Sequence, residues 1–288
     1  MMSAMACRLC EGGDLHRRLA FPPFSLWRCR HCGFEQIDPE PTSEQLRRIY
    51  SIAYFGKAKY GDERSLAHEY RRRRALMRRA GILPGMRLLE VGCGIADFLE
   101  TLADDHDITG IDISEDAVDQ AKARRPDLAD RFEATAIEAF EPSGDGYDAI
   151  LMWDVIEHLW NGPSMLIDVA RWLRPGGRLV LSTPDVTALT ARLMGKKWPF
   201  MTPPEHLSFF GAKSIQLAGK KAGLKTLSTR SKGKWANVAF VLYKAGRVGL
   251  LPSALVDFLN RLGLDHLSIY VPTGDVLYAA LEKPAVQG

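Results

Sequence analysis

The feature that most constrains the fold of this 288-residue chain is an alternation of short apolar runs with helical segments from Arg87 onward. Each apolar run is long enough for one strand, and the segments between them have the spacing of amphipathic helices. The expected strands lie within 87–94, 107–114, 131–137, 147–153, 178–184, 225–230 and 276–284, and the expected helices within 96–105, 114–125, 164–173 and 211–224. Strands that alternate with helices form a parallel sheet covered on both faces. The sequence therefore predicts an α/β fold with a doubly wound, mainly parallel, Rossmann-like sheet.

Four of the five cysteines form two C-x2-C pairs near the N-terminus, and they are Cys7, Cys10, Cys29 and Cys32. Four thiolates at this spacing are typical ligands of a tetrahedral structural zinc ion, which would have no open position for catalysis. The fifth, Cys93, lies in a glycine-rich turn and is interpreted as a small packing residue. We therefore predict a small zinc-binding ribbon over residues 1–42.

The remaining segments predict a linker and a main domain. Residues 43–80 are expected to form a helical linker or cofactor cover, with Thr42 or Ser43 as the cap. The main domain covers 81–288, with an apolar helical insertion at about 235–272. This insertion could cover the active site, contact a second subunit in a homodimer, or lie on a membrane surface. Its sparse lysines and arginines favour the first two roles.

The composition is ordinary for a globular protein. A net charge of +3 gives no reason to expect nucleic acid as a partner, and the arginines at 71–74, 78 and 79 are interpreted as a solvated helix face. The N-terminus lacks a signal-peptide pattern, and no apolar run is long enough to span a membrane. We therefore expect a cytoplasmic protein without a transmembrane segment.

The turn after the first strand, at 92–97, predicts a ligand site. A dinucleotide site of the G-x-G-x-x-G/A type needs a small residue where this chain has Asp97. Glu90 is unfavourable beside phosphates and favourable beside an ammonium group. Asp112 ends the second strand, where a carboxylate can accept both hydroxyls of a ribose. An amine and a ribose without phosphate fit S-adenosylmethionine.

Four separated motifs resemble those of the class I S-adenosylmethionine-dependent methyltransferases. They are EVGCG at 90–94, GIDIS at 110–114, WDVIEHL at 153–159 and LRPGGRLVLSTP at 173–184. The resemblance covers roughly residues 80–230. The paired C-x2-C motifs and PPEHLSFF at 203–210 resemble a narrower branch with an N-terminal zinc module. That branch includes enzymes that act on sugars, quinone precursors and secondary metabolites.

The resemblance implies a set of cofactor-binding residues, which are Glu90, Gly92, Gly94, Asp112, Ile113, Ala136, Ile137 and Trp153. Glu90 and the two glycines would hold the methionine end, Asp112 the ribose and Ile113 the adenine. Two positions depart from the family pattern. Ala96 replaces a third glycine, which we expect to be a mild change because alanine is small. Thr135 stands where an acidic residue often receives the adenine amino group.

The motif WDVIEH is expected beside the transferable methyl group, because the fourth strand ends there in this family. His158 is the first candidate for the base that removes the acceptor proton, although Glu157 and His158 could instead support the next loop. A second hypothesis is a divalent cation, Mg²⁺ or Mn²⁺. The residues that would hold it are Asp154, Glu157, His158 and His206. Similar sets occur in ubiquinone-biosynthesis O-methyltransferases and small-RNA 2′-O-methyltransferases, which begin the motif with Glu instead of Asp.

Two further segments are candidates for the acceptor side. Lys196 and Lys197 could meet an anion, and the aromatic residues that could stack on a ring are Trp198, Phe200 and Phe209, with core packing and solvated lysines as the alternative. The residues that could close over the cofactor are Tyr54, Phe55 and Tyr60.

The leading functional hypothesis is methyl transfer to a hydroxyl, less readily a carbon, of a small molecule such as a sugar, phenol or secondary metabolite. The alternative is RNA methylation, with the ribbon and the arginines as the docking surface. An inactive methyltransferase-like scaffold and a nicotinamide oxidoreductase rank lower. The sequence leaves the acceptor, the methylated atom and the oligomeric state open.

Overall fold

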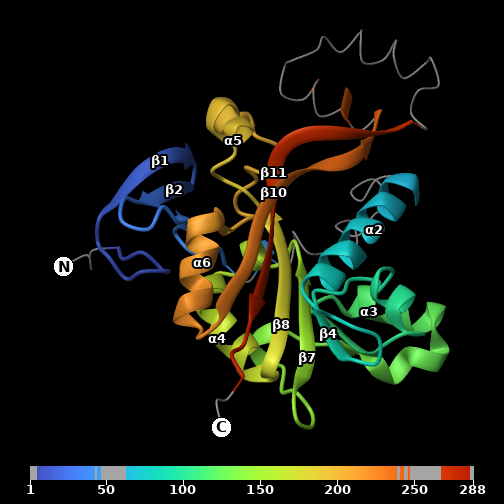
Figure 1. Ribbon diagram of the computed structural model, residues 1–288. Helices are drawn as coiled ribbons and strands as arrows, with labels where there is room; N and C mark the ends of the chain where they lie inside the picture. Colours follow the sequence, from blue (N-terminus) through green and yellow to red (C-terminus); the bar gives the residue numbers. More distant parts are fainter. Residues whose placement is uncertain are drawn as a thin grey trace.

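The computed structural model describes residues 5–42, 44–46, 63–238, 241–242, 246 and 267–285. Its main sheet has seven strands in the order β10-β11-β8-β7-β4-β5-β6 (Figure 1). These strands are β4 (Arg87–Val91), β5 (Asp107–Asp112), β6 (Phe132–Ala134), β7 (Tyr147–Trp153), β8 (Leu173–Pro184), β10 (Lys225–Asn237) and β11 (Ser268–Glu282).

Most of this sheet is parallel. β4 is parallel to both β5 and β7, β6 is parallel to β5, and β8 is parallel to β7. Only β11 runs the other way, because it is antiparallel to its neighbours β8 and β10. The chain moves from β4 outward to β5 and β6 and then returns to β7 on the other side of β4. The expected doubly wound, mainly parallel sheet is confirmed, and its switch point lies between β4 and β7, where open α/β sheets bind ligands.

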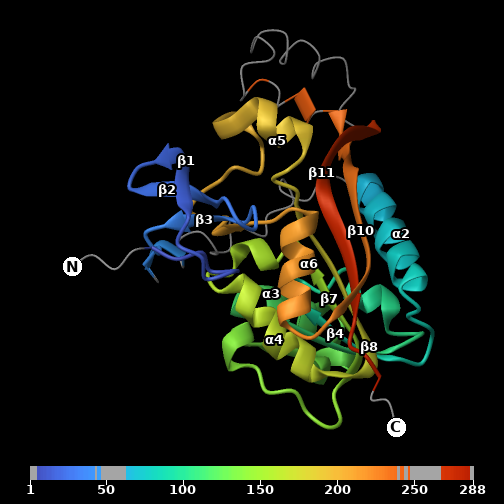
Figure 2. The same ribbon diagram turned by 60° about the vertical axis from the view of Figure 1, so that its left-hand side comes forward.

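The helices of the main domain are α2 (Glu63–Arg79), α3 (Glu115–Arg124), α4 (Gly162–Trp172), α5 (Leu189–Met194) and α6 (Ala212–Lys221). α5 packs in a separate cluster with the second sheet, and the other helices cover the two faces of the main sheet. α4 and α6 lie on one side of the sheet and α2 on the other (Figure 2). Side chains of β7 alternate between the two cores. Ile150 and Met152 pack on the α4 side, whereas Ala149 and Leu151 pack on the side of α2 and α3. This alternation is what a strand buried on both faces requires.

A second sheet has the order β1-β2-β3-β9. Its strands are β1 (Leu15–Phe21), β2 (Phe24–Cys29), β3 (Glu35–Asp38) and β9 (Ser208–Phe209). β9 belongs to the segment that precedes α6, yet it pairs with β3, since Glu35 lies opposite Phe209 and Gln36 opposite Ser208. The N-terminal strands therefore share a sheet with the main domain, and Phe34 joins the core on the α4 side.

The segment 96–105, expected to be an amphipathic helix, forms only a 3₁₀ turn at Leu99–Leu102, so this prediction is wrong. The Thr101 hydroxyl donates to the Phe98 carbonyl oxygen, a local bond that competes with helix propagation. The single turn already buries both leucines, which are the residues whose spacing suggested the helix.

The ends of the insertion predicted at 235–272 are also wrong, because both are strand. β10 continues to Asn237 and β11 begins at Ser268. Trp235 lies opposite Tyr270 across the two strands, with ring centroids 5.6 Å apart, and such aromatic pairs stabilise a ladder. Most of the insertion and the predicted cover residues Tyr54, Phe55 and Tyr60 lie outside the described residues.

Arg71, Arg78 and Arg79 of α2 are exposed, as the sequence suggested, but the other three arginines of this set are not part of a solvated face. Arg72 donates to the Gly233 carbonyl oxygen at 2.7 Å, and the Arg73 guanidinium lies 5.0 Å from the Trp153 ring centroid. Arg74 donates to the Thr101 carbonyl oxygen. The interpretation fails for these three residues because α2 packs directly on the sheet. Among the described helices, none combines the length and the apolar character needed to cross a membrane.

Candidate functional site

The glycine turn after β4 is held close to the loop after β7. Gly92 and Gly94 have φ values of +70° and +56°, in the left-handed region that favours glycine. A Cβ at Gly92 would lie 2.5 Å from a methyl carbon of Val155, so the turn has no room for a side chain. Ala96 also has a positive φ, +56°. Alanine at this position is therefore a strained conformation and not the mild change in size that the sequence suggested.

Asp112, at the end of β5, ties the turn to its neighbouring strand. Its Oδ2 accepts a hydrogen bond from the Gly94 backbone N–H at 2.7 Å, and its Oδ1 accepts one from the Ser114 N–H at 2.9 Å. Burial raises the pKa of this carboxyl group. The next side chain, Ile113, is 63% exposed although it is apolar. An exposed apolar side chain beside a buried carboxylate offers a surface for a flat ring.

The loop after β6 meets the same point. The Thr135 N–H donates to the Asp112 carbonyl oxygen at 2.9 Å. Ala136 follows as a half-buried residue, and Ile137 is buried. The predicted cofactor residues of three different strands therefore come together at the carboxyl edge of the sheet.

Glu90 is a buried carboxylate with incomplete hydrogen bonding. It is 3% exposed, and its Oε2 has no hydrogen-bond partner among the described residues. Burial raises its pKa to about 8, and the Arg73 guanidinium opposes that rise. Trp153, at the end of β7, has a buried indole Nε1 that is also unpaired within the described part of the chain. A buried carboxylate of this kind is costly unless a cation or a donor joins it, so the site is complementary to a cationic group.

Two residues of α2 complete this region, and the sequence analysis missed both. Arg73 faces Glu90, and Tyr70 lies beside Phe98, with ring centroids 5.2 Å apart. Burial and a hydrogen bond to Asp97 raise the pKa of Tyr70. Their i, i+3 spacing places them on one helix face. That spacing was visible in the sequence, but the neighbouring arginines concealed which residues face inward.

The end of β7 carries an ion pair. Asp154 has a φ of +56°, its Oδ1 accepts from the Ser182 hydroxyl at 2.9 Å, and its Oδ2 lies 3.3 Å from Lys234 Nζ. The Asp154 and Lys234 side chains are 34% and 36% exposed. Burial would raise the pKa of Asp154, but the cations of Lys234 and Arg73 outweigh it and lower this pKa to about 2. Sequence reasoning missed Lys234, because only the strand pairing brings β10 to this place.

Glu157, His158 and His206 form a compact group. Glu157 and His158 lie in the 3₁₀ turn η5 (Ile156–His158), and His206 lies just before β9. One potential ligand atom of each lies within 4.8 Å of the others. The Nδ1 atoms of His158 and His206 contact the carbonyl oxygens of Glu205 and Phe200 at 2.9 and 2.8 Å. Burial, and then the Asp154 charge, raise the pKa of Glu157.

The four residues predicted to hold a divalent cation are therefore divided into two groups. Glu157, His158 and His206 lie together, whereas Asp154 pairs with Lys234 and Ser182 and is outside the group. The Asp154 carboxylate instead contacts Ser182 of β8 and Lys234 of β10.

The other predicted acceptor residues have mostly structural positions. Trp198 and Phe209 are each 1% exposed and belong to one core cluster, and the Trp198 Nε1–H donates to Asp275 Oδ2 at 3.2 Å. Lys196 and Lys197 are exposed. Phe200 lies near the site, because Lys234 Nζ is 5.1 Å from its ring centroid, and the buried Phe209 ring meets the His206 ring at 6.1 Å between centroids.

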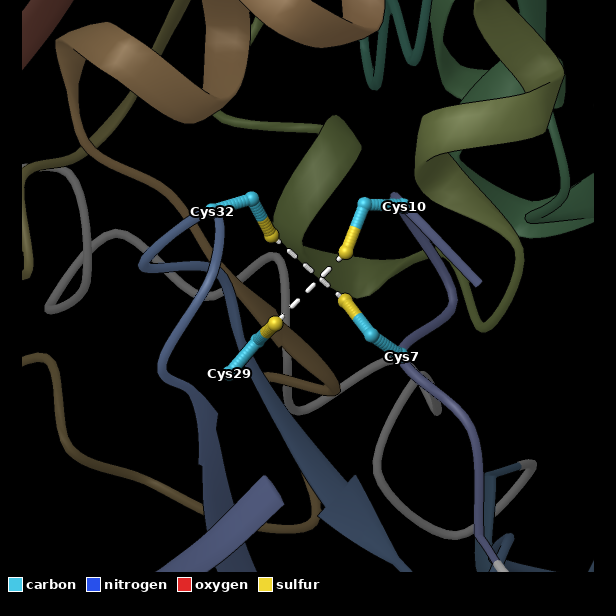
Figure 3. A group of neighbouring side chains, drawn as sticks. All are labelled: Cys7, Cys10, Cys29 and Cys32. Atoms are coloured by element: carbon cyan, nitrogen blue, oxygen red, sulfur yellow. Dashed lines mark hydrogen bonds between the residues drawn. The ribbon is translucent and has the colours of Figure 1, made fainter. Parts of the chain in front are cut away.

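The four N-terminal cysteines form a second cluster, and their sulfur atoms point toward one another (Figure 3). The Sγ atoms of Cys7 and Cys32 are 3.6 Å apart, and those of Cys10 and Cys29 are 3.5 Å apart. A tetrahedral site with metal–sulfur bonds of the usual zinc length has sulfur atoms about 3.8 Å apart. All four cysteines are free of disulfide bonds. These two separations are close to that value, and the four sulfur atoms form a group that could hold a metal ion.

A mainly parallel sheet with an antiparallel strand inserted near one edge, and with a glycine turn and acidic residues at its carboxyl edge, defines a Rossmann-like methyltransferase fold. Residues 63–229 match the model of a family described as "Methyltransferase domain". This range is more than half of the chain, so the chain belongs to that family. The N-terminal cysteine cluster lies outside the matched range.

Curated relatives include two small-molecule O-methyltransferases. The ubiquinone biosynthesis O-methyltransferase of Coxiella burnetii (strain Dugway 5J108-111) is 28% identical over 154 residues, which are 50% of this chain and 66% of that protein. The 27-O-demethylrifamycin SV methyltransferase of Amycolatopsis mediterranei (strain S699) is 37% identical over 132 residues, which are 42% of this chain and 48% of that protein. The chain thus matches less than two thirds of the length of either relative.

Solved structures share the fold at low sequence identity. The [4+2]-cyclase SpnF has a TM-score of 0.56 and 18% identity, over 86% of this chain and 98% of its own. The N-methyltransferase NodS from Bradyrhizobium japonicum WM9, in complex with S-adenosyl-L-homocysteine, has a TM-score of 0.53 and 17% identity, over 85% of this chain and 100% of its own. Since one of these is named a cyclase, the fold alone does not define the reaction.

Proposed function

We propose that this protein transfers a methyl group from S-adenosylmethionine to a hydroxyl, less readily a carbon, of a small molecule. The observation that carries the donor assignment is the buried, unpaired carboxylate oxygen of Glu90 beside the glycine turn. The names of the ubiquinone and rifamycin relatives support a small-molecule hydroxyl as the acceptor. A sugar, a phenol or a secondary metabolite belongs to this class.

The residues at the carboxyl edge of the sheet fit this donor. Glu90 would receive the ammonium of the methionine end. Asp112 uses one position on each oxygen for a backbone N–H, and a carboxylate has about four lone-pair positions, so it can also accept the two ribose hydroxyls. The exposed Ile113 offers an apolar surface to the adenine ring. A pyrophosphate would instead meet the carboxylates of Glu90 and Asp97, which disfavours a dinucleotide.

The histidine pair provides a proton acceptor. The donor supplies a methyl group on a sulfonium, and the protein must align the acceptor oxygen with it and remove the hydroxyl proton. Because a carbonyl oxygen only accepts hydrogen bonds, the Nδ1 atoms of His158 and His206 carry the protons in the neutral rings. Each Nε2 then has the lone pair. We assign the role of base to His158, with His206 as its neighbour.

A divalent cation is the alternative for activating the acceptor. The residues that would hold it are Glu157, His158 and His206, with the same Nε2 lone pairs as ligands. The ion would supply Lewis acidity toward the acceptor hydroxyl. Asp154 has no part in this site because it is paired with Lys234. One carboxylate and two imidazoles suit Mn²⁺ or another transition metal better than Mg²⁺.

We also propose that the four cysteines bind one structural zinc ion. The sulfur separations of 3.5 and 3.6 Å support a tetrahedral site. Without a cation the sulfurs must share protons, and the Cys32 thiol accordingly lowers the pKa of Cys7 to about 5. Elemental analysis of the purified protein should find about one zinc per chain. Protein that carries no zinc and keeps a stable ribbon would contradict this assignment.

The experiment that tests the function is transfer of labelled methyl from S-adenosylmethionine into separated small-molecule and RNA fractions. Each fraction is assayed after chelation of divalent ions and again with Mg²⁺ or Mn²⁺ added. Label in small molecules regardless of the ion would support His158 as the base, and label that requires the ion would support the metal alternative. Label found only in RNA would refute the proposed acceptor class. Absence of donor binding in calorimetry would refute the donor.

A further inference from the structure

Arg8 lies inside the first cysteine pair yet contacts the main domain. Its Nη2 donates to the Leu207 carbonyl oxygen at 2.8 Å, and its guanidinium carbon lies 3.7 Å from the ring centroid of Trp160. Neither Leu207 nor Trp160 belongs to the N-terminal ribbon. Arg8, which lies between the candidate metal ligands Cys7 and Cys10, therefore also contacts the segment that carries His206.

Leu207 is the residue where three parts of the molecule meet. Its carbonyl oxygen accepts from Arg8 and also from the Ile37 N–H of β3 at 3.1 Å. Its own N–H donates to the Glu157 carbonyl oxygen at 2.8 Å. The ribbon and the turn η5 are therefore joined through one backbone unit.

The same short segment orients both histidines. His206 directly precedes Leu207, and the Glu205 carbonyl oxygen accepts the hydrogen bond of His158 Nδ1. The two imidazole rings meet edge to face, with centroids 4.7 Å apart. A displacement of the Leu207 backbone would therefore move one ring and remove the orienting partner of the other.

The cysteine cluster restrains Arg8 from both sides. Cys7 and Cys10 flank it in the chain, and the Arg8 backbone N–H donates to Gln36 Oε1 at 2.8 Å. The Gln36 amide in turn donates to the Ala6 carbonyl oxygen at 3.0 Å. A planar guanidinium can stack on an indole and donate in its own plane at the same time, which a lysine ammonium cannot do.

We infer that Arg8 is a positioning residue through which the cysteine cluster sets the geometry of the His158–His206 pair. The role of that pair in methyl transfer rests on the function proposed above, but the coupling itself is a property of the fold. A metal held by the four cysteines would fix Arg8, and Arg8 would fix Leu207. The N-terminal cluster then acts on the acceptor side of the site and leaves the donor side alone.

Hydrogen exchange of the full-length protein, read by mass spectrometry, tests this inference. We compare the wild type with Arg8→Met and with the matched control Arg17→Met, since Arg17 is an exposed arginine of the same ribbon. The reporter amides are Leu207 and Ile37, and those of β5 serve as an internal reference. Arg8→Met should accelerate exchange at the reporters by roughly ten- to a hundredfold, the effect of losing a hydrogen bond to a charged group. The reference amides and the control should not change.

A second readout distinguishes positioning from general loss of structure. The ring Cε1–H signals of the seven histidines are assigned by single substitutions and compared among the variants. Arg8→Met should shift the signals of His158 and His206 only, and Arg8→Lys, which keeps a donor for Leu207, should restore part of both effects. If Arg8→Met also loosens β5, the same comparison is made with Arg8→Lys alone. Unchanged reporter exchange and unchanged histidine signals would overturn the inference.

Chelation supplies an independent test. Wild-type protein treated with a zinc chelator should show the same faster exchange at Leu207 and the same shifts of the His158 and His206 signals as Arg8→Met, with additional shifts of His16 and His31 in the ribbon itself. Metal loss without either change would overturn the coupling. Binding of S-adenosylmethionine, measured by calorimetry on the same samples, reports on the proposed function separately. Failure of donor binding in the wild type would refute that function while leaving the exchange result intact.

Discussion

Two carboxylates at the carboxyl edge of the sheet have opposite protonation behaviour. Burial raises the pKa of Glu90 to about 8, whereas Lys234 and Arg73 overcome burial at Asp154 and lower its pKa to about 2. At neutral pH Asp154 is therefore a fixed negative charge and not a proton acceptor. Glu90 is largely protonated until a cation arrives. Glu90 is thus suited to bind a cationic donor, and the Asp154 carboxylate is suited to hold the Lys234 ammonium in an ion pair.

At the residue scale, donor binding should be coupled to proton release. A cationic ammonium binds the ionised form of Glu90, so binding must expel the proton at any pH below about 8. The affinity for S-adenosylmethionine should therefore rise with pH up to that value. Calorimetry in buffers of different ionisation enthalpy measures the released proton. Glu90→Gln should bind about 1–3 kcal/mol more weakly and lose this pH dependence, whereas an identical pH dependence in the variant would contradict the prediction.

A second residue-scale prediction concerns the ion pair of Lys234. Lys234→Met should lower the free energy of unfolding by about 1 kcal/mol at pH 7, a modest value because the pair is about one third exposed. Asp154 has a lowered pKa in the folded state, so its contribution is full above the unfolded pKa of about 4. The contribution is lost as the pH falls toward about 2.

Urea denaturation at several pH values measures this effect, with the exposed Lys232 of the same strand replaced by Met as the control. The difference between Lys234→Met and the wild type should disappear at low pH. A difference that persists there would show that the lysine stabilises through its cation–π contact with Phe200 instead of through Asp154.

At the scale of elements, the turn after β4 is determined by two requirements at one position. Gly92 has a positive φ, and its missing Cβ is what allows Val155 of the neighbouring loop to approach. Gly81, after α2, has a similar φ of +83° but no atom within 4 Å of an added Cβ. A substitution at Gly81 therefore meets backbone strain alone, whereas a substitution at Gly92 meets backbone strain and a steric clash.

This contrast predicts the effect of two alanine substitutions. Gly81→Ala should cost about 1 kcal/mol of unfolding free energy, the conformational term alone. Gly92→Ala should cost about 1–3 kcal/mol more, because the Val155 side chain or the turn must move. Denaturant titration of both variants measures the two terms. Equal losses of unfolding free energy in the two variants would mean that the Val155 loop moves aside without an energetic cost.

We expect that the ribbon can unfold while the main domain stays folded. The ribbon's hydrophobic residues Leu9 and Phe34 join the core under α4. A unit of about forty residues needs a metal or a larger core for stability.

Metal removal should therefore unfold the ribbon while the seven-stranded sheet remains. We expect chelation to remove exchange protection from β1 to β3 and to leave the affinity for S-adenosylmethionine within about twofold, because Glu90 faces Arg73 of α2, whereas Leu9 and Phe34 pack on the α4 side of the sheet. Calorimetry before and after chelation provides the measurement. Loss of donor binding together with the metal would show that the two parts fold as one unit.

At the scale of the whole molecule, the charge distribution favours a small acceptor over RNA. The net charge is +3, and Arg72, Arg73 and Arg74 of α2 are engaged within the protein. Arg72 contacts Tyr278, and Arg18 of the ribbon pairs with the buried Glu35. Arginines in such contacts are not available to neutralise phosphates.

RNA binding should accordingly be weak. In a retardation assay at physiological salt, a mixed RNA pool should show no binding at micromolar protein concentration. Replacing the exposed Arg71 and Arg78 by glutamine should change nothing. Tight binding with a steep dependence on salt would contradict this prediction and favour the RNA alternative.

The sequence could predict the features that depend on local pattern. Strand and helix alternation indicated the sheet, because periodicity is a local signal. The glycine turn and Asp112 indicated the ligand edge, because the turn follows one expected strand and Asp112 ends the next. The paired cysteines likewise indicated the cluster from their spacing. The helix expected at 96–105 failed because one buried 3₁₀ turn satisfies the same apolar spacing.

The tertiary structure alone decided which distant side chains meet. Lys234 reaches Asp154 because β10 lies beside β11 and β11 beside β8, and no local pattern in the chain encodes that pairing. Arg8 reaches Leu207 because β9 adds to the ribbon sheet. The sequence by itself determined the type of fold and indicated the ligand edge, since periodicity and turn chemistry act over short distances. Packing decided the acceptor side, since its charges come from segments far apart in the chain.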